Sequence, residues 1–306
     1  MTSGKNDWLA EQFEKHRTHL RAVAYRMLGS QGEADDAVQE AWLRLSRTGG
    51  EGIENLGGWL TTVVARVALD ALRSRKTRRE EALDDEPAPA LPSPGQTASL
   101  DPEQEAILAD SVSLALLVVL DRLDPPERVA FVMHDMFSTP FEEIAPILGR
   151  TPVAVRKLAS RARERVRGGP ALPAHDLSEQ RKTVEAFLAA MRAGDFNGIV
   201  AALDPNVVVR IDEAAARPGA PREVHGAEAW ARGAIAFSQY ARFTQPALID
   251  GSVGLIFAPG GRLIRVLKFT HANGRIANVK IIADPAHLRQ LDLAVLGNAG
   301  AVDSAR

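Results

Sequence analysis

The sequence predicts a multidomain protein in which two all-α domains, the second with a helix-turn-helix, precede a C-terminal α+β domain. Apolar residues recur at helical spacing over residues 8–80 and again over 104–168, so both segments are expected to be helical. Between them, residues 81–103 are rich in proline and small residues and are expected to form a linker. Residues 178–290 combine helical patterns with strand-like runs, which is typical of an α+β domain.

The composition is that of a globular protein. The chain has 306 residues, of which 45% are hydrophobic, and its net charge is −2, so attraction to nucleic acid must come from local clusters. The absence of cysteine excludes disulfides, thiolate metal sites and cysteine nucleophiles. We expect no metal and no cofactor. The first residues lack an apolar signal core, and no apolar run approaches membrane length, so a cytoplasmic protein without a membrane segment is expected.

The N-terminal domain is expected to contain three helices. The first has an apolar stripe from Phe13 to Leu28 and is closed by Gly29. The second covers residues 33–45, and the third begins near Trp59 after a glycine-rich loop.

One face of the second helix carries acidic and amide side chains. They are Asp35, Asp36, Gln39 and Glu40. At helical spacing they lie opposite Val38, Trp42 and Leu45, which are expected to be buried. Taken alone, a solvated face over a buried tryptophan explains this pattern.

The third helix ends in a basic cluster. Its members are Arg73, Arg75, Lys76, Arg78 and Arg79. Cations near a helix C-terminus are favoured by the helix dipole, which explains part of the cluster. Because the cluster is denser than a helix end requires, a contact with phosphates is an equally good interpretation.

Residues 141–163 predict two short helices joined by a tight turn. Gly149 can adopt the positive φ that ends the first helix, Thr151 caps the second, and Pro152 occupies its first position. The side chains expected to face inward on the second helix are Val153, Val155, Leu158, Ala159 and Ala162. Those expected to face outward are Arg156, Lys157, Ser160, Arg161 and Arg163. This pattern indicates a helix-turn-helix whose second helix can enter the DNA major groove.

The C-terminal domain is expected to contain helices at 178–193 and 227–237. Strand-like runs cover 207–211, 253–258, 262–270 and 275–282. The dipeptide Asn273-Gly274 predicts a hairpin turn between the last two runs. Titratable residues that an enzyme pocket could use are Asp212, His225, His271 and Asp284. They show no diagnostic spacing, so structural or solvated roles are expected.

In combination, these features resemble the extracytoplasmic-function (ECF) sigma factors of bacterial RNA polymerase. Residues 35–43 look like their polymerase-binding segment, and residues 55–70 look like the segment that binds the promoter −10 element. Residues 123–131 with the helix-turn-helix look like their −35 domain. The resemblance implies a non-enzymatic protein whose partners are core RNA polymerase and promoter DNA.

The resemblance also implies roles for individual residues. Those implied to bind the polymerase are Asp35, Asp36, Gln39, Glu40, Leu43 and Arg44. Those implied at the −10 element are Asn55, Trp59, Thr62, Arg66, Arg73, Arg75 and Lys76. Those implied at the −35 element are Arg156, Lys157, Ser160 and Arg161. The helical phase of Trp59 with Val63 favours a core position over a base-stacking role.

Residues beyond the helix-turn-helix resemble a SnoaL-like domain, the α+β cone also found in nuclear transport factor 2 (NTF2). Sigma factors with this extension form a subgroup called SigJ-like. Two motifs that are usual in this subgroup are altered in this sequence. Residues 87–94 stand in place of the linker motif, and residues 258–262 stand in place of the motif in the extension. The resemblance implies that the domain modulates activity through contacts with the sigma domains, with an unidentified small ligand in the cone as a further partner.

Two other interpretations remain open. A helix-turn-helix regulator with a ligand-sensing domain would bind a palindrome as a dimer, and would leave residues 35–79 unexplained. A SnoaL-like enzyme fused to a DNA-binding module would show turnover that depends on a pocket carboxylate or histidine.

Overall fold

A computed structural model describes residues 2–50, 52–81, 113–169, 172–216, 219 and 221–296. The described chain divides into two compact units. The first contains residues 2–81 and 120–164, and the second contains residues 113–119 and those from 165 onward. The predicted linker, 81–103, lies outside the described residues apart from residue 81.

Three long helices form the first part of the helical unit, as the sequence predicted. They are α1 (Thr2–Leu28), α2 (Gln31–Thr48) and α3 (Leu56–Glu81). The helix α2 begins at a cap, because the Ser30 side chain accepts a hydrogen bond from the Glu33 amide. The apolar stripes of the three helices meet in one core, in which Leu20, Leu45 and Leu60 are fully buried.

Four shorter elements complete the helical unit. They are α7 (Pro125–Phe131), η1 (Val132–Met136), α8 (Phe141–Leu148) and α9 (Pro152–Arg167). The last three residues of α9 belong to the second unit. The Pro125-Pro126 pair starts α7, where a missing N–H costs nothing. The helical stretch that begins with α7 continues directly into the π-helix η1.

Within this unit α3 lies against α7, and α1 contacts η1. The Lys76 ammonium binds the Asp124 carboxylate at 2.7 Å. The guanidinium of Arg26 lies 4.8 Å from the centre of the Phe137 ring. The two predicted helical domains are therefore packed together in this structure.

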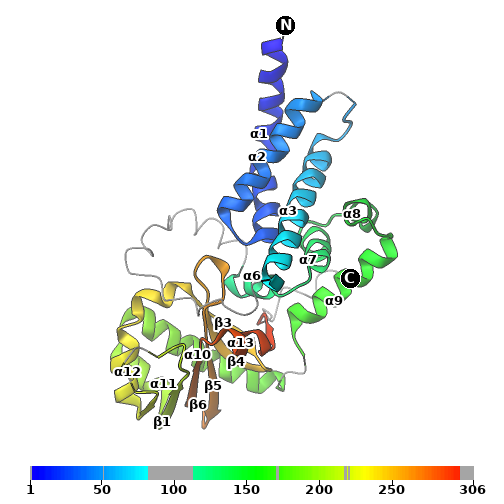
Figure 1. Ribbon diagram of the computed structural model, residues 1–306. Helices are drawn as coiled ribbons and strands as arrows, with labels where there is room; N and C mark the ends of the chain where they lie inside the picture. Colours follow the sequence, from blue (N-terminus) through cyan, green and yellow to red (C-terminus); the bar gives the residue numbers. More distant parts are fainter. Residues whose placement is uncertain are drawn as a thin grey trace. The chain divides into compact units, whose positions relative to one another are not determined.

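The second unit is built on a seven-stranded mixed sheet of order β2-β1-β6-β5-β4-β3-β7 (Figure 1). Its strands are β1 (Leu203–Ile211), β2 (Glu223–His225), β3 (Thr244–Ile249), β4 (Ser252–Phe257), β5 (Arg265–Ala272), β6 (Arg275–Ile282) and β7 (Leu293–Ala294). Its helical elements are α10 (Ala174–Ala193), α11 (Phe196–Ala202), α12 (Ala227–Ile235), η2 (Ser238–Phe243), η3 (Pro259–Gly261) and α13 (Pro285–Gln290). Only β1 and β6 pair in parallel.

The four predicted strand runs and both predicted helices of this unit are confirmed. The hairpin between β5 and β6 turns at Asn273 and Gly274, whose φ angles of 52° and 72° are the positive pair that a type I′ turn requires. The strands β2, β3 and β7 and the helices α11 and α13 were not predicted.

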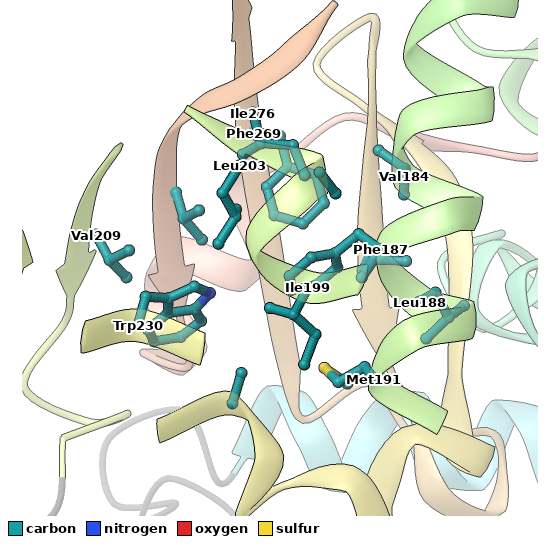
Figure 2. Close-up of a cluster of buried hydrophobic side chains, with 14 of the residues drawn as sticks. Val184, Phe187, Leu188, Met191, Ile199, Leu203, Val209, Trp230, Phe269 and Ile276 are labelled. Carbon is teal, nitrogen blue, oxygen red and sulfur yellow. The ribbon is translucent and has the colours of Figure 1, made fainter. Parts of the chain in front are cut away.

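The main core of this unit lies between the helices and one sheet face, which we call the inner face (Figure 2). Phe187 and Met191 of α10, Ile199 of α11 and Phe269 of β5 belong to this core (Figure 2). The Phe187 and Phe269 rings meet edge to face, with centroids 5.9 Å apart.

The opposite, outer face of the sheet is covered by a segment from before the helix-turn-helix. This segment is α6 (Leu114–Leu120). Its residues Ala115, Val118 and Val119 pack in one apolar cluster with Ile256 and Val266. The Ser113 hydroxyl and the Ala115 amide both contact the Gln245 side-chain oxygen on β3, at 3.1 and 3.4 Å. Thus α6 is anchored to the C-terminal sheet.

Candidate nucleic-acid interface

The helix-turn-helix forms as the sequence predicted. Gly149 ends α8 with a φ of 63°, and its amide donates to the Ala145 carbonyl. The Thr151 hydroxyl accepts a hydrogen bond from the Ala154 amide at 3.3 Å, which caps α9. The turn therefore fixes the direction in which α9 leaves α8.

The exposed face of α9 is basic. Arg156, Lys157 and Arg161 are exposed, and Ser160 beside them is half-buried. The Arg156 guanidinium lies 5.3 Å from the centre of the Phe141 ring, a cation–π contact that holds it over the first helix of the motif. Three of the four residues assigned to the −35 element thus present their side chains to solvent on one helix.

Two expectations for α9 were wrong. Val153, expected to be buried, is 62% exposed, because the buried stripe is Val155, Ala159 and Ala162 and position 153 lies on the far side of the helix. Arg163, expected to face outward, binds Asp135 of η1 at 2.5 Å. Both differences follow from the position of each residue around the helix relative to the buried stripe. The exposed Val153 lies on the same face as Arg156 and Lys157, where a valine can contact a thymine methyl group.

The acidic face of α2 is also exposed. Asp35, Asp36 and Gln39 are exposed, while Val38 and Leu45 are buried on the opposite side. Leu43 is 40% exposed, an apolar side chain among polar ones. Local pairs order this face: Asp35 binds Arg21 at 2.9 Å, and Glu40 binds Arg44 at 2.8 Å.

The residues assigned to the −10 element are spread along α3, and only Asn55, Trp59 and Thr62 lie at its start. The Asn55 side chain accepts a hydrogen bond from the Gly58 amide at 2.9 Å, so it caps α3. Trp59 and Thr62 are half-buried. The Trp59 ring is therefore only partly in the core, where its helical phase had predicted it. Arg66 and Arg73 are exposed farther along the helix.

The basic end of α3 is partly engaged by acidic partners. Arg75 donates to Glu33 and to the Leu28 carbonyl, and its side chain is only 23% exposed. Lys76 is bound to Asp124. In this structure both cations therefore stabilise the helical unit, and a phosphate would have to compete with these carboxylates for them.

Comparisons with known proteins agree with this geometry. Residues 12–78 match the family described as Sigma-70 region 2, and residues 113–166 match Sigma-70, region 4. The ECF RNA polymerase sigma factor SigJ of Mycobacterium tuberculosis H37Rv is 38% identical over 296 residues, which cover 90% of this chain and 91% of the relative. This chain belongs to the ECF sigma factors. It directs promoter recognition by RNA polymerase and is not an enzyme.

The C-terminal unit of this ECF sigma factor is an α+β unit built on a mixed sheet. The crystal structure of the M. tuberculosis ECF sigma factor SigJ covers 90% of this chain and 97% of its own, at 33% identity and a TM-score of 0.44. An NTF2-like protein from Burkholderia xenovorans LB400 covers 42% of this chain and 92% of its own, at 13% identity and a TM-score of 0.27. No described helix is both long and apolar enough to span a membrane.

The four titratable candidates of the C-terminal unit, all among the described residues, make different side-chain contacts. The Asp212 carboxylate accepts hydrogen bonds from the amides of Ala215, Ala283 and Asp284, at 2.7, 2.7 and 2.9 Å. Asp284 caps α13, and His225 is exposed beside Glu223. His271 is half-buried, and burial lowers its pKa. Each of these side chains thus has its own local environment in the ECF sigma factor.

Proposed function

We propose that this ECF sigma factor docks on core RNA polymerase through α2, contacts the −10 element through α3 and the −35 element through α9, and is modulated by its C-terminal domain. The observation that carries the last step is the packing of α6 on the C-terminal sheet. Residues 113–119 lie within the region 4 match, yet they belong to the same compact unit as the sheet.

The polymerase contact rests on the exposed face of α2. Carboxylates and amides there can form charge-assisted hydrogen bonds, and Leu43 supplies an apolar contact. Asp36→Lys should therefore weaken binding to core polymerase, whereas Glu14→Lys, which reverses an exposed carboxylate on α1, should not. Affinity is measured with purified core enzyme, and equal affinities of the two variants would contradict the assignment.

The −10 contact rests on the start and exposed face of α3. In this proposal the exposed Arg66 and Arg73 hold backbone phosphates of a melted strand, and an extruded base of that strand is read in the loop before α3. Arg75 and Lys76 can join them only after leaving Glu33 and Asp124. Trp59 is better placed to support the loop than to act as a free stacking platform, because it is half-buried.

Promoter binding requires the helical unit to open. Elements at −10 and −35 lie about 25 base pairs apart, which is roughly 85 Å along B-DNA. In this structure α3 lies against α7, and Lys76 binds Asp124. The two promoter-binding regions must therefore separate. Because α6 is the start of region 4, the contacts that hold α6 on the C-terminal sheet restrain region 4 during that movement.

A disulfide lock tests the modulation. Because the chain has no cysteine, Ser113→Cys with Gln245→Cys would create a single pair of thiols, and a short bis-methanethiosulfonate reagent can join them through two reducible disulfides in the oxidised form. The reagent replaces the length of the Gln245 side chain, whose oxygen lies 3.1 Å from the Ser113 hydroxyl. We expect the oxidised double variant to transcribe less than its reduced form, and each single variant to be insensitive to reductant. Equal run-off transcription by the oxidised and reduced forms would contradict a role for α6 release.

A further inference from the structure

The C-terminal unit contains an apolar cavity that the promoter-binding function does not use. Its volume is about 290 Å³, close to the lower end of the range for small-molecule sites. Its walls come from α10, α12, η2 and the inner face of the sheet. They include Trp230, Phe237, Tyr240, Phe257, Arg265 and Leu267.

The lining determines what the cavity can hold. It is overwhelmingly apolar, and its one charged residue is Arg265, whose guanidinium also donates to the Ala215 carbonyl at 3.2 Å. A cation at an apolar wall favours an anionic partner, since an arginine can bind a carboxylate with two parallel hydrogen bonds. The described lining contains no carboxylate and no histidine, so it offers no general base for turnover.

We propose that this cavity binds an apolar monoanion: a small carboxylic acid with an aromatic or hydrocarbon body, its carboxylate directed to Arg265. The hydrocarbon part would be enclosed by the aromatic side chains Trp230, Phe237 and Phe257. This deepens, and rests on, the proposed role of the C-terminal domain as a modulator.

Alternating residues of the same strands connect the cavity to α6. Phe257, Arg265 and Leu267 line the cavity on the inner face, whereas Ile256 and Val266 belong to the apolar cluster of α6 on the outer face. The register pairs Phe257 with Arg265 and Ile256 with Val266, so both rows cross the same two strands. A ligand that shifts these strands on one side therefore alters the surface that α6 contacts on the other.

Matched variants separate the parts of the site. Gly233 lines the cavity on α12, is exposed, and a Cβ added there meets nothing within 4 Å, so Gly233→Leu adds a bulky apolar side chain at the lining from a position where its Cβ has room. Leucine also has the higher helix propensity, which protects the fold. The control is Ala201→Leu, at an exposed position on α11 that is not part of the lining. Arg265→Gln removes the charge and keeps an amide donor.

The probes are 2-naphthoate and the neutral 2-naphthalenemethanol, titrated calorimetrically into the full-length chain. We expect saturable binding of naphthoate to the unmodified chain and to Ala201→Leu, and loss of binding in Gly233→Leu. Arg265→Gln should weaken naphthoate about tenfold while changing the alcohol by less than about twofold. No saturable binding, or binding unaffected by Gly233→Leu, would overturn the site; equal losses of both probes in Arg265→Gln would overturn the preference for an anion.

A transcription assay distinguishes failure of the site from failure of the proposed function. Binding that leaves run-off transcription unchanged would refute the connection between cavity and α6 while the binding site stands. Redox-dependent transcription by the disulfide variant without any binding of the probes would refute the site while modulation through α6 stands.

Discussion

Arg161 and Arg163 occupy the same helix two residues apart, yet their surroundings differ. Arg161 is exposed on the face of α9 that carries Arg156 and Lys157, whereas Arg163 is bound to Asp135. At the scale of single residues, the environment therefore separates side chains that bind DNA in our proposal from those that hold the unit together.

Replacing Arg156 and Arg161 with alanine should reduce promoter selectivity. A bidentate arginine–guanine contact contributes about 1–3 kcal/mol of discrimination, so we expect roughly tenfold less preference for the cognate −35 sequence. The measurement is run-off transcription from cognate and −35-mutated promoters, with binding to core polymerase unchanged. Arg163→Ala is the control, expected to lower stability through loss of the Asp135 pair. Unchanged cognate transcription by the double variant would contradict the assignment.

His271 should make the C-terminal unit sensitive to mild acid. Its ring nitrogens are buried without a hydrogen-bond partner among the described residues, and burial lowers its pKa below 6.5. The unfolded chain therefore takes up a proton first as the pH falls, so stability present above about pH 6.5 is lost progressively below it.

The test compares thermal unfolding at about pH 7.5 and about pH 5.5. The acid-induced decrease in melting temperature should be smaller in His271→Leu than in the unmodified chain. His175→Leu, at a site 80% exposed, should retain the full decrease. An identical decrease in His271→Leu and the unmodified chain would show that this histidine is not responsible.

Much of the candidate site could be predicted from residue types and helical phase. The exposed acids of α2 and the basic face of α9 follow from spacing alone. The engagement of Arg75 and Lys76 could not be predicted, because their partners Glu33 and Asp124 lie 42 and 48 residues away. Charge clusters in a sequence show where cations gather, but not which of them are already neutralised by the fold.

At the scale of elements, the turn of the helix-turn-helix depends on one backbone conformation. Gly149→Ala should destabilise the helical unit by about 1–2 kcal/mol, because a left-handed conformation is unfavourable for a residue with a Cβ. An added Cβ meets nothing within 4 Å, so sterics with neighbours contribute no further cost. Gly32→Ala, within α2, should be neutral or slightly stabilising. Urea denaturation measures both, and equal midpoints would contradict the prediction.

The elements that the sequence did not predict are short or interrupted. The strands β2 and β7 have three and two residues, too few for an alternating pattern to be recognised. Pro246 lies inside β3, and a proline normally argues against a strand. These segments are ordered by pairing with neighbours that are distant in sequence, so local propensity carries little signal for them.

At the scale of the whole molecule, the surface ion pair of Lys76 and Asp124 is one of the contacts that join the two sigma regions of the helical unit. An exposed pair of this kind contributes about 0.2–1 kcal/mol, little enough for DNA and polymerase to overcome it. Asp124→Lys places two cations side by side and should favour the open helical unit.

Fluorescence energy transfer detects this opening. Cysteines introduced at Glu14 and Glu142 carry the dyes, since the natural chain has none. Transfer should decrease in Asp124→Lys and remain unchanged in Asp70→Lys, which reverses an exposed carboxylate of α3 that faces Arg73 at 3.7 Å. Equal transfer in both variants would mean that the Lys76–Asp124 pair does not hold the closed form.

The π-helix η1 makes the helical unit tolerant of one particular deletion. A π-turn accommodates one more residue than an α-turn, so removing a single residue from Val132–Met136 lets the helix tighten to a regular α-helix. The elements after η1 then keep their direction relative to α7. The cost is local and falls on contacts of η1 itself, such as the stacking of His134 on Phe141 with ring centroids 3.8 Å apart. One residue removed from the regular helix α9 would instead turn the rest of that helix by about 100°.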